Sequence, residues 1–261
     1  MSTEHRPTLL AFELATEACS VALLHHGQLL ARHAVAPRRH VELALPWAEA
    51  LLAEAGLAKA QLDALAVGVG PGAFTGVRLA ISLVQGIALG LDRPVLPVST
   101  LAALAAPFLI EGPVLAAIDA RMGELYVGEF AADADGLPRA LATEVLLPVG
   151  EAAAMLSTRW TTVGAPASFD ATADGRQRRL GVGVGTGFAA DGGAWFESIA
   201  DRFVRIDADA LPTASAVARI AELDFAAGRA VAPERLEPTY LRDKVALTSA
   251  EQAAARAAKS G

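Results

Sequence analysis

The chain has 261 residues, of which 53% are hydrophobic, enough to bury one large core or two smaller ones. Its formal charge of −7 argues against a broad nucleic-acid surface of its own, and solvated loops explain local basic clusters such as Arg38-Arg39-His40. The lone Cys19 excludes an intramolecular disulfide and fits a reducing compartment. With no signal-peptide layout and no uninterrupted apolar run of membrane-spanning length, we expect a cytoplasmic protein without a membrane partner.

The first half of the chain predicts an antiparallel meander followed by alternating helices and strands. The order β-β-β-α-β-α-β-α is typical of a mixed sheet with helices on both faces. The predicted strands are 8–14, 20–25, 28–35, 64–69 and 94–98, and the predicted helices are 41–55, 75–91 and 99–108, the last with Ser99 or Thr100 as N-cap.

The second half begins in the same way. Glu13 ends the first strand of the first half, and Asp119 ends the first strand of the second. We interpret this as an imperfect duplication of one βββαβαβα unit, with an eroded second copy. The predicted strands are 113–118, 124–130, a weaker 139–146, 161–163 and 180–184, and the predicted helices are 149–157, 194–202 and 213–227.

Between strand 64–69 and helix 75–91 lies the sequence GPGAFTG, which has two interpretations. Glycines at a strand-to-helix junction suit a phosphate cradle, and they equally suit a tight turn that needs close backbone approach. The turn is favoured, because strand 94–98 is not followed by an acidic residue that would hold a ribose and no lysine follows the glycines. The motif residues here are Gly70, Pro71, Gly72, Phe74, Thr75, Gly76 and Arg78.

After Thr75 at its start, helix 75–91 is apolar around most of its circumference, and its polar residues Arg78, Ser82 and Gln85 form a single narrow stripe. This pattern indicates burial on two sides, by the helix's own sheet and by something else. The second cover is a partner protein, a second copy in a C2 dimer, or flanking helices of the same chain. The candidate partner interface comprises Leu43, Trp47 and Ala50 of helix 41–55 and Val77, Ala80, Ile81, Val84, Ile87 and Ala88 of helix 75–91.

Four strings narrow the choice of family: GPGAFTGVRLAISLVQGIALG, PVLPVSTLAALA, IDARMGELYVGEF and PTYLRDKVA. Within the actin-like ATPase architecture they resemble the bacterial TsaB family, which takes part in making N6-threonylcarbamoyladenosine on tRNA. The resemblance covers residues 8–130 and 237–246, and it adds Asp119, Arg121, Gly123 and Glu124 to the motif residues.

The resemblance implies a two-lobed actin-like (ribonuclease H-like) α/β fold of duplicated βββαβαβα units. We expect an N-terminal lobe over 1–109 that carries the partner-binding helices, with helix 213–228 packed back on it. A smaller, degenerate second lobe is expected over 110–212 and a flexible tail over 243–261.

The resemblance also implies a non-catalytic scaffold that binds and activates a TsaD-like threonylcarbamoyltransferase. A TsaE-like ATPase would be engaged only through the complex, the chain alone would be a homodimer, and no tRNA contact is expected from this chain alone. TsaD-like proteins carry a histidine pair at i, i+4 as metal ligands, which this chain lacks, and the family's acidic residue with following hydroxyls is replaced by Glu13-Leu14-Ala15. We therefore expect no catalytic, cofactor-binding or metal-binding residue.

Two alternatives stay open. The first is a stand-alone actin-like small-molecule kinase or ATPase. The second and less favoured is a glycoprotease-type peptidase, for which the sequence holds neither G-x-S-x-G nor H-E-x-x-H.

Overall fold

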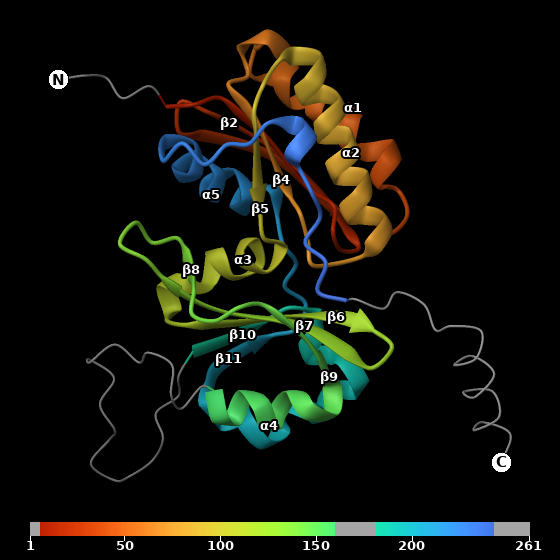
Figure 1. Cartoon of the computed structure of the whole chain (residues 1–261), viewed down its shortest axis with the longest axis vertical. Coiled ribbons are helices and arrows are strands. Elements are labelled where there is room, and N and C mark those ends of the chain that lie inside the picture. The colour runs from red at the N-terminus through yellow and green to blue at the C-terminus, as the bar shows by residue number, and fades with distance from the viewer. Residues whose placement is uncertain (1–5, 160–180, 243–261) are drawn as a thin grey trace, which may run out of the picture.

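The computed structural model describes residues 6–159 and 181–242, which fold into two lobes, each built on one mixed sheet (Figure 1). The strands of the first lobe are β1 (Leu9–Glu13), β2 (Ala18–His25), β3 (Gln28–Val35), β4 (Ala64–Gly68) and β5 (Val95–Val98). Their order is β3-β2-β1-β4-β5; β2 is antiparallel to β1 and β3, and β4 is parallel to β1 and β5. The central strands are buried almost throughout, because helices cover this sheet on both faces.

The second sheet repeats this pattern. Its order is β11-β10-β6-β7-β8, and β9 also pairs with β7. β6 and β7 form an antiparallel hairpin, and β10 is parallel to β6 and β11. The strands are β6 (Val114–Arg121), β7 (Glu124–Ala132), β8 (Pro138–Ala140), β9 (Val145–Pro148), β10 (Gly181–Val184) and β11 (Phe203–Asp207).

The predicted third strand of this lobe, 139–146, is wrong in detail. β8 pairs with residues 130–132 of β7 and β9 with residues 124–127, so two short strands share one edge of β7 across a break. Glu144 lies in that break, where its carboxylate accepts a hydrogen bond from Ser99 of the first lobe. Strand β11 was not predicted, because its residues directly follow a helical segment and the two patterns merge.

Each lobe carries helices on its outer face. The helices α1 (His40–Glu54) and α2 (Phe74–Leu91) cover the first sheet (Figure 1). The second sheet is covered by α4 (Val149–Arg159) and by η3 (Thr186–Arg202), two helical pieces joined by the non-helical residues 190–193. By length and composition α2 could cross a membrane. Its buried side packs on β4, so it forms a layer of the first lobe.

The inner faces are covered by two short helices that the lobes exchange. α3 (Thr100–Ala105), from the first half, packs on β6, β7 and β8, whereas α5 (Ala214–Ala226) packs on β1, β2, β4 and β5. Both lie between the sheets in one shared core (Figure 1). Ser99 and Thr213 cap them, accepting from the N–H groups of Ala102 (3.2 Å) and Ala216 (3.3 Å).

Both halves therefore follow the order βββαβαβα when β8 and β9, which share one edge of β7, are counted as the third strand of the second copy and η3 as its second helix. This confirms the predicted two-lobed actin-like fold. The predicted strand 161–163 and tail 243–261 lie outside the described residues.

Candidate functional site

A cleft of about 1000 Å³ separates the lobes. It is lined by the β1–β2 turn, the start of α1, the GPGAFTG loop with the start of α2, the β6–β7 hairpin, the start of η3 and residues 239–242. In an actin-like ATPase this cleft would hold nucleotide and Mg²⁺, so the acidic residues at the strand ends decide whether that chemistry is available.

Glu13 ends β1 and is only 1% exposed, and it does not line the cleft. Its Oε1 accepts from the Ala15 N–H (2.8 Å), and its Oε2 accepts from the Thr100 hydroxyl (3.1 Å). A Cβ on Gly68 would lie 1.9 Å from Oε2, so the carboxylate rests directly against β4. Burial raises the pKa of Glu13 from 4.5 to about 7, although these hydrogen bonds favour the charged form.

The glycines of the GPGAFTG loop lie against the backbone of the β1–β2 turn. A Cβ on Gly72 would approach the Ala15 carbonyl oxygen to 2.4 Å, and one on Gly76 would approach the Leu14 carbonyl oxygen to 2.1 Å. The Ala73 N–H donates to the same Ala15 carbonyl (2.7 Å). These glycines therefore permit the loop to pack on its own chain.

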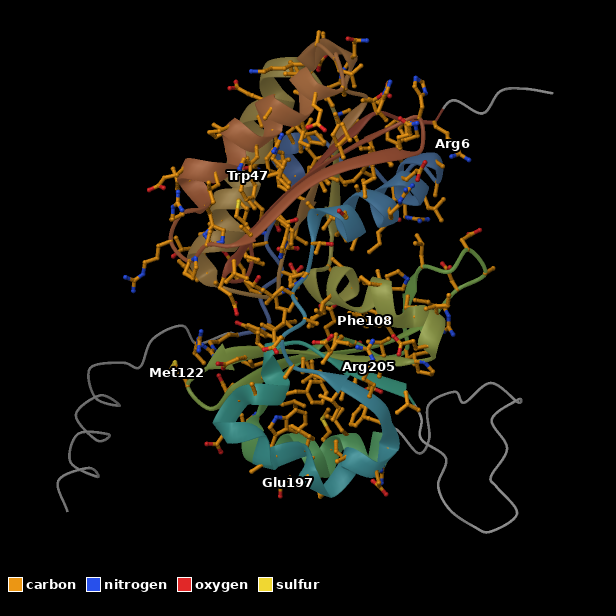
Figure 2. The ribbon with its side chains drawn as sticks, turned by 180° about the vertical axis from the view of Figure 1, so that it is seen from behind. Arg6, Trp47, Phe108, Met122, Glu197 and Arg205 are labelled. Carbon is orange, nitrogen blue, oxygen red and sulfur yellow. The ribbon has the colours of Figure 1, made fainter. Side chains whose placement is uncertain are left out.

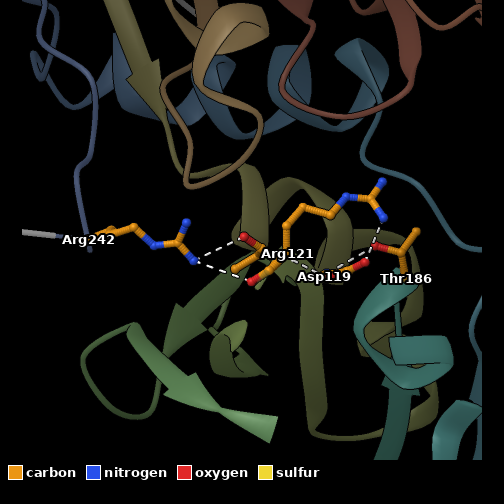
Figure 3. A network of polar contacts seen from close by, with 5 residues as sticks. Asp119, Arg121, Thr186 and Arg242 are labelled. Carbon is orange, nitrogen blue, oxygen red and sulfur yellow. Dashed lines mark hydrogen bonds and ion pairs between the residues drawn. The ribbon is translucent and has the colours of Figure 1, made fainter. Parts of the chain in front are cut away.

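The β6–β7 hairpin is held by the other end of the chain (Figure 3). Asp119 accepts from the Arg121 backbone N–H (2.7 Å) and guanidinium (2.9 Å) and donates its own N–H to Thr186 (3.2 Å). The Arg242 guanidinium donates to the carbonyls of Ala120 (3.1 Å) and Arg121 (3.4 Å) and to the Glu124 carboxylate. The motif acids are thus engaged within the chain. Asp119 pairs with Arg121, and Glu124 pairs with Arg242.

Residues 233–242 form a strap that runs along α2 and crosses to this hairpin. The Gln85 amide donates to the carbonyls of Pro233 (2.9 Å) and Leu236 (3.2 Å). The Arg78 guanidinium lies 3.1 Å from the Phe74 ring centroid and 4.9 Å from that of Tyr240. The polar side chains of Arg78 and Gln85 on α2 therefore serve contacts within the chain.

The structure corrects part of the candidate partner interface. Five of its residues are at most 5% exposed, because they form the side of α2 that packs on the first sheet, so they cannot face a partner. The other four are half-buried, and three of them, Leu43, Trp47 and Ile87, pack against the edge of the same core. Figure 2 labels Trp47 on α1. The buried five are Val77, Ala80, Ile81, Val84 and Ala88; the half-buried four are Leu43, Trp47, Ala50 and Ile87.

The outward side of α2 carries residues that sequence reasoning missed. Ser82, Gly86 and Gly90 are exposed at i, i+4 and i+8, with half-buried Leu79 and Leu83 beside them. Glycine spacing within a long helix was the available signal. We define the α1–α2 surface as Leu43, Trp47, Ala50, Leu79, Ser82, Leu83, Gly86, Ile87 and Gly90.

The described residues hold no group of three or more His, Cys, Asp or Glu side chains that could bind a metal. His40 begins α1, where its Nε2 donates to the carbonyls of Thr16 (3.0 Å) and Ala18 (3.2 Å). Cys19 is buried, which raises the pKa of its thiol to about 11. With Glu13 turned away from the cleft, the residues present do not fit a Mg²⁺–phosphate site.

Comparison with known proteins places the chain in a family. Residues 33–250 match the TsaD model, described as tRNA N6-adenosine threonylcarbamoyltransferase. Two curated relatives are named tRNA threonylcarbamoyladenosine biosynthesis protein TsaB. The Escherichia coli relative is 38% identical, covering 91% of this chain and 96% of its own; the Haemophilus influenzae relative is 35% identical, covering 91% and 94%.

Two solved structures are also similar to this chain in sequence and in fold. A Pseudomonas aeruginosa protein described as similar to the peptidase YeaZ is 42% identical with a TM-score of 0.75, covering 90% of this chain and all of that one. A second structure, of YeaZ from the same organism, is 40% identical with a TM-score of 0.71 over the same shares. By sequence and by fold, the chain belongs to the TsaB family of tRNA threonylcarbamoyladenosine biosynthesis proteins.

Proposed function

We propose that this chain is a non-catalytic subunit that binds and activates a TsaD-like threonylcarbamoyltransferase during formation of N6-threonylcarbamoyladenosine on tRNA, in the cytoplasm. The names of its relatives support the pathway. The observation that carries the supporting role is the placement of Glu13. The acid that an actin-like ATPase would turn toward Mg²⁺ is buried here against β4 and hydrogen-bonded to Ala15 and Thr100.

The TsaD-like subunit would dock on the α1–α2 surface. Gly86 and Gly90 have no side chain, so a partner helix can approach the α2 backbone closely. The half-buried side chains beside them supply apolar area that is already ordered by the core, so little side-chain entropy is lost on docking. A second copy of this chain would cover the same surface when the partner is absent, which makes homodimer and heterodimer mutually exclusive.

Activation would follow from binding alone. A partner held in its competent conformation gains activity by population shift, limited by its differential affinity for the two conformations. This chain supplies no reacting group in that scheme, and a TsaE-like ATPase acts only through the assembled complex.

The test is Gly86→Arg, with Gly150→Arg on α4 as the matched control. An added Cβ meets no heavy atom within 4 Å at either glycine, and both are exposed, so both variants should fold. A charged side chain in the middle of a dry interface should weaken binding of the TsaD-like subunit about 100-fold or more. Gly150→Arg should bind as the wild type does.

Single-turnover threonylcarbamoyl transfer separates binding from chemistry. Activity with Gly86→Arg should fall in proportion to the complex lost and return when the variant is in large excess. Unchanged affinity in calorimetry would contradict the docking surface. A rate that stays low at saturation would contradict the supporting role, because this chain would then act on the chemical step.

The described residues do not support the two alternatives, a stand-alone ATPase and a peptidase. For the peptidase named in the Pseudomonas structure's description, a thiol mechanism would need a reactive cysteine, and the chain's only thiol, Cys19, is buried with its pKa raised to about 11.

A further inference from the structure

Exposed apolar and aromatic side chains gather where the cleft opens. Val41 lies in the first turn of α1 and is 71% exposed, Phe74 begins α2 and is 52% exposed, and Tyr240 of the strap is 52% exposed. Arg38 precedes α1, and Arg121 at the hairpin tip has a side chain that is 81% exposed. All five residues line the cleft. We call this group, contributed by both lobes and the strap, the cleft mouth.

The charge of the cleft is opposite to that of the whole chain. Its lining contains four arginines (Arg38, Arg78, Arg121 and Arg242) and two carboxylates (Glu17 and Asp119), whereas the chain carries a formal charge of −7. Arg121 and Arg242 already pair with Asp119 and Glu124. Among the described residues, no carboxylate lies within ion-pair distance of Arg38 or Arg78. The cleft therefore has unmatched positive charge.

The amides of the turns beside the cleft offer few free donors for a phosphate. The Ala15 N–H donates to Glu13 and the Ala73 N–H to Ala15, so these turn amides are already engaged. The Gly70 N–H likewise donates to Thr100. An RNA strand needs many phosphate contacts, which two unmatched arginines on an acidic protein do not provide. Exposed aromatic and apolar groups beside arginine are instead typical of a protein interface.

We propose that the cleft mouth binds an acidic segment of polypeptide, carrying at least one apolar side chain, that belongs to the subunit docked on the α1–α2 surface. This inference rests on the proposed function. Val41 and Phe74 lie in the first turns of the same two helices that carry the docking surface, so the two regions are continuous. The carboxylates would meet Arg38 and Arg78, and the apolar side chain would contact Val41 and Phe74.

The variants Arg38→Glu and Val41→Ser test this at exposed positions, with Arg139→Glu on β8 as the control for charge reversal. The purified TsaD-like subunit is the probe, titrated by calorimetry at low and high salt. Arg38→Glu should weaken Kd about tenfold or more at low salt and reduce its salt dependence, because an attractive charge contact is replaced by a repulsive one. Val41→Ser should weaken Kd severalfold at both salt concentrations, and Arg139→Glu should match the wild type.

The outcomes separate the two proposals. If Gly86→Arg abolishes binding while Arg38→Glu and Val41→Ser bind as the wild type does, the docking surface stands and the acidic segment is wrong. If wild-type chain fails to bind the TsaD-like subunit, both proposals fall. If Arg38→Glu leaves the Kd for the TsaD-like subunit unchanged but raises the KM for tRNA, RNA is the occupant. If millimolar ATP displaces the TsaD-like subunit from the wild-type chain, a nucleotide is the occupant. Either result overturns the inference.

Discussion

Replacing Glu13 with glutamine should make the protein more stable at alkaline pH and leave it unchanged at acidic pH. The folded chain holds the Glu13 proton up to a pKa of about 7, whereas the unfolded chain loses it near 4.5. The stability that this protonation contributes is fully present below pH 4.5 and is lost as the pH rises through 7. At about 1.4 kcal/mol for each pH unit, the loss reaches up to about 3 kcal/mol.

Glutamine avoids that loss and can keep both contacts. Its amide oxygen accepts from the Ala15 N–H, and its NH₂ group donates to the Thr100 hydroxyl oxygen. Glu13→Gln should therefore exceed the wild type by up to about 3 kcal/mol at pH 8 and match it near pH 4.

Urea unfolding followed by tryptophan fluorescence at the two pH values measures this difference, provided that the m-values agree. Glu234→Gln, at an exposed carboxylate of the strap, is the control and should change stability at neither pH. If Glu13→Gln were less stable than the wild type at pH 8, the ionised carboxylate would be needed in the fold. That result would refute a Glu13 side chain that is buried in its neutral form.

Two further predictions follow from the same region of the first lobe. Gly76→Ala should lower the free energy of unfolding by about 2 kcal/mol or more, because its Cβ would meet the Leu14 carbonyl oxygen at 2.1 Å. Gly90→Ala should raise the free energy of unfolding by about 1 kcal/mol, because its Cβ meets no atom within 4 Å and alanine favours the helix. Equal melting temperatures of the two variants would contradict this prediction. The Cys19 thiol, buried and with its pKa raised to about 11, should react with a disulfide reagent at pH 8 only as fast as the chain unfolds, so rapid labelling of native protein would show that it is accessible.

The spacing of apolar residues along the sequence predicted most of the fold, because strands and helices repeat that spacing with different periods. The meander and the first two helices were found within a residue or two of their observed ends, since strand alternation and helical spacing are distinct there. Strand β11 and the break between β8 and β9 were missed because both depend on tertiary pairing. β11 forms beside β10, and Glu144 leaves the strand to accept from Ser99.

The candidate interface shows a different limit. Both sides of α2 are apolar or small, so composition cannot say whether Ala80 or Gly86 faces the core. Packing on β4 places Ala80 inside and leaves Gly86 exposed. The strap was equally beyond local pattern, because the bonds from Gln85 to residues 233 and 236 join segments about 150 positions apart.

Because α3 and α5 each pack on the sheet of the other half of the chain, the first lobe cannot finish folding until late in synthesis. The first lobe's strands emerge early, but the inner face of their sheet, including Leu9 and Leu24, is covered by α5, which begins at residue 214. Until the ribosome has made that helix, the face stays open to water, and closing it requires a contact between the two ends of the chain, which is slow to form. A chain stopped before residue 214 would keep an uncovered apolar sheet, a ready substrate for chaperones and for aggregation.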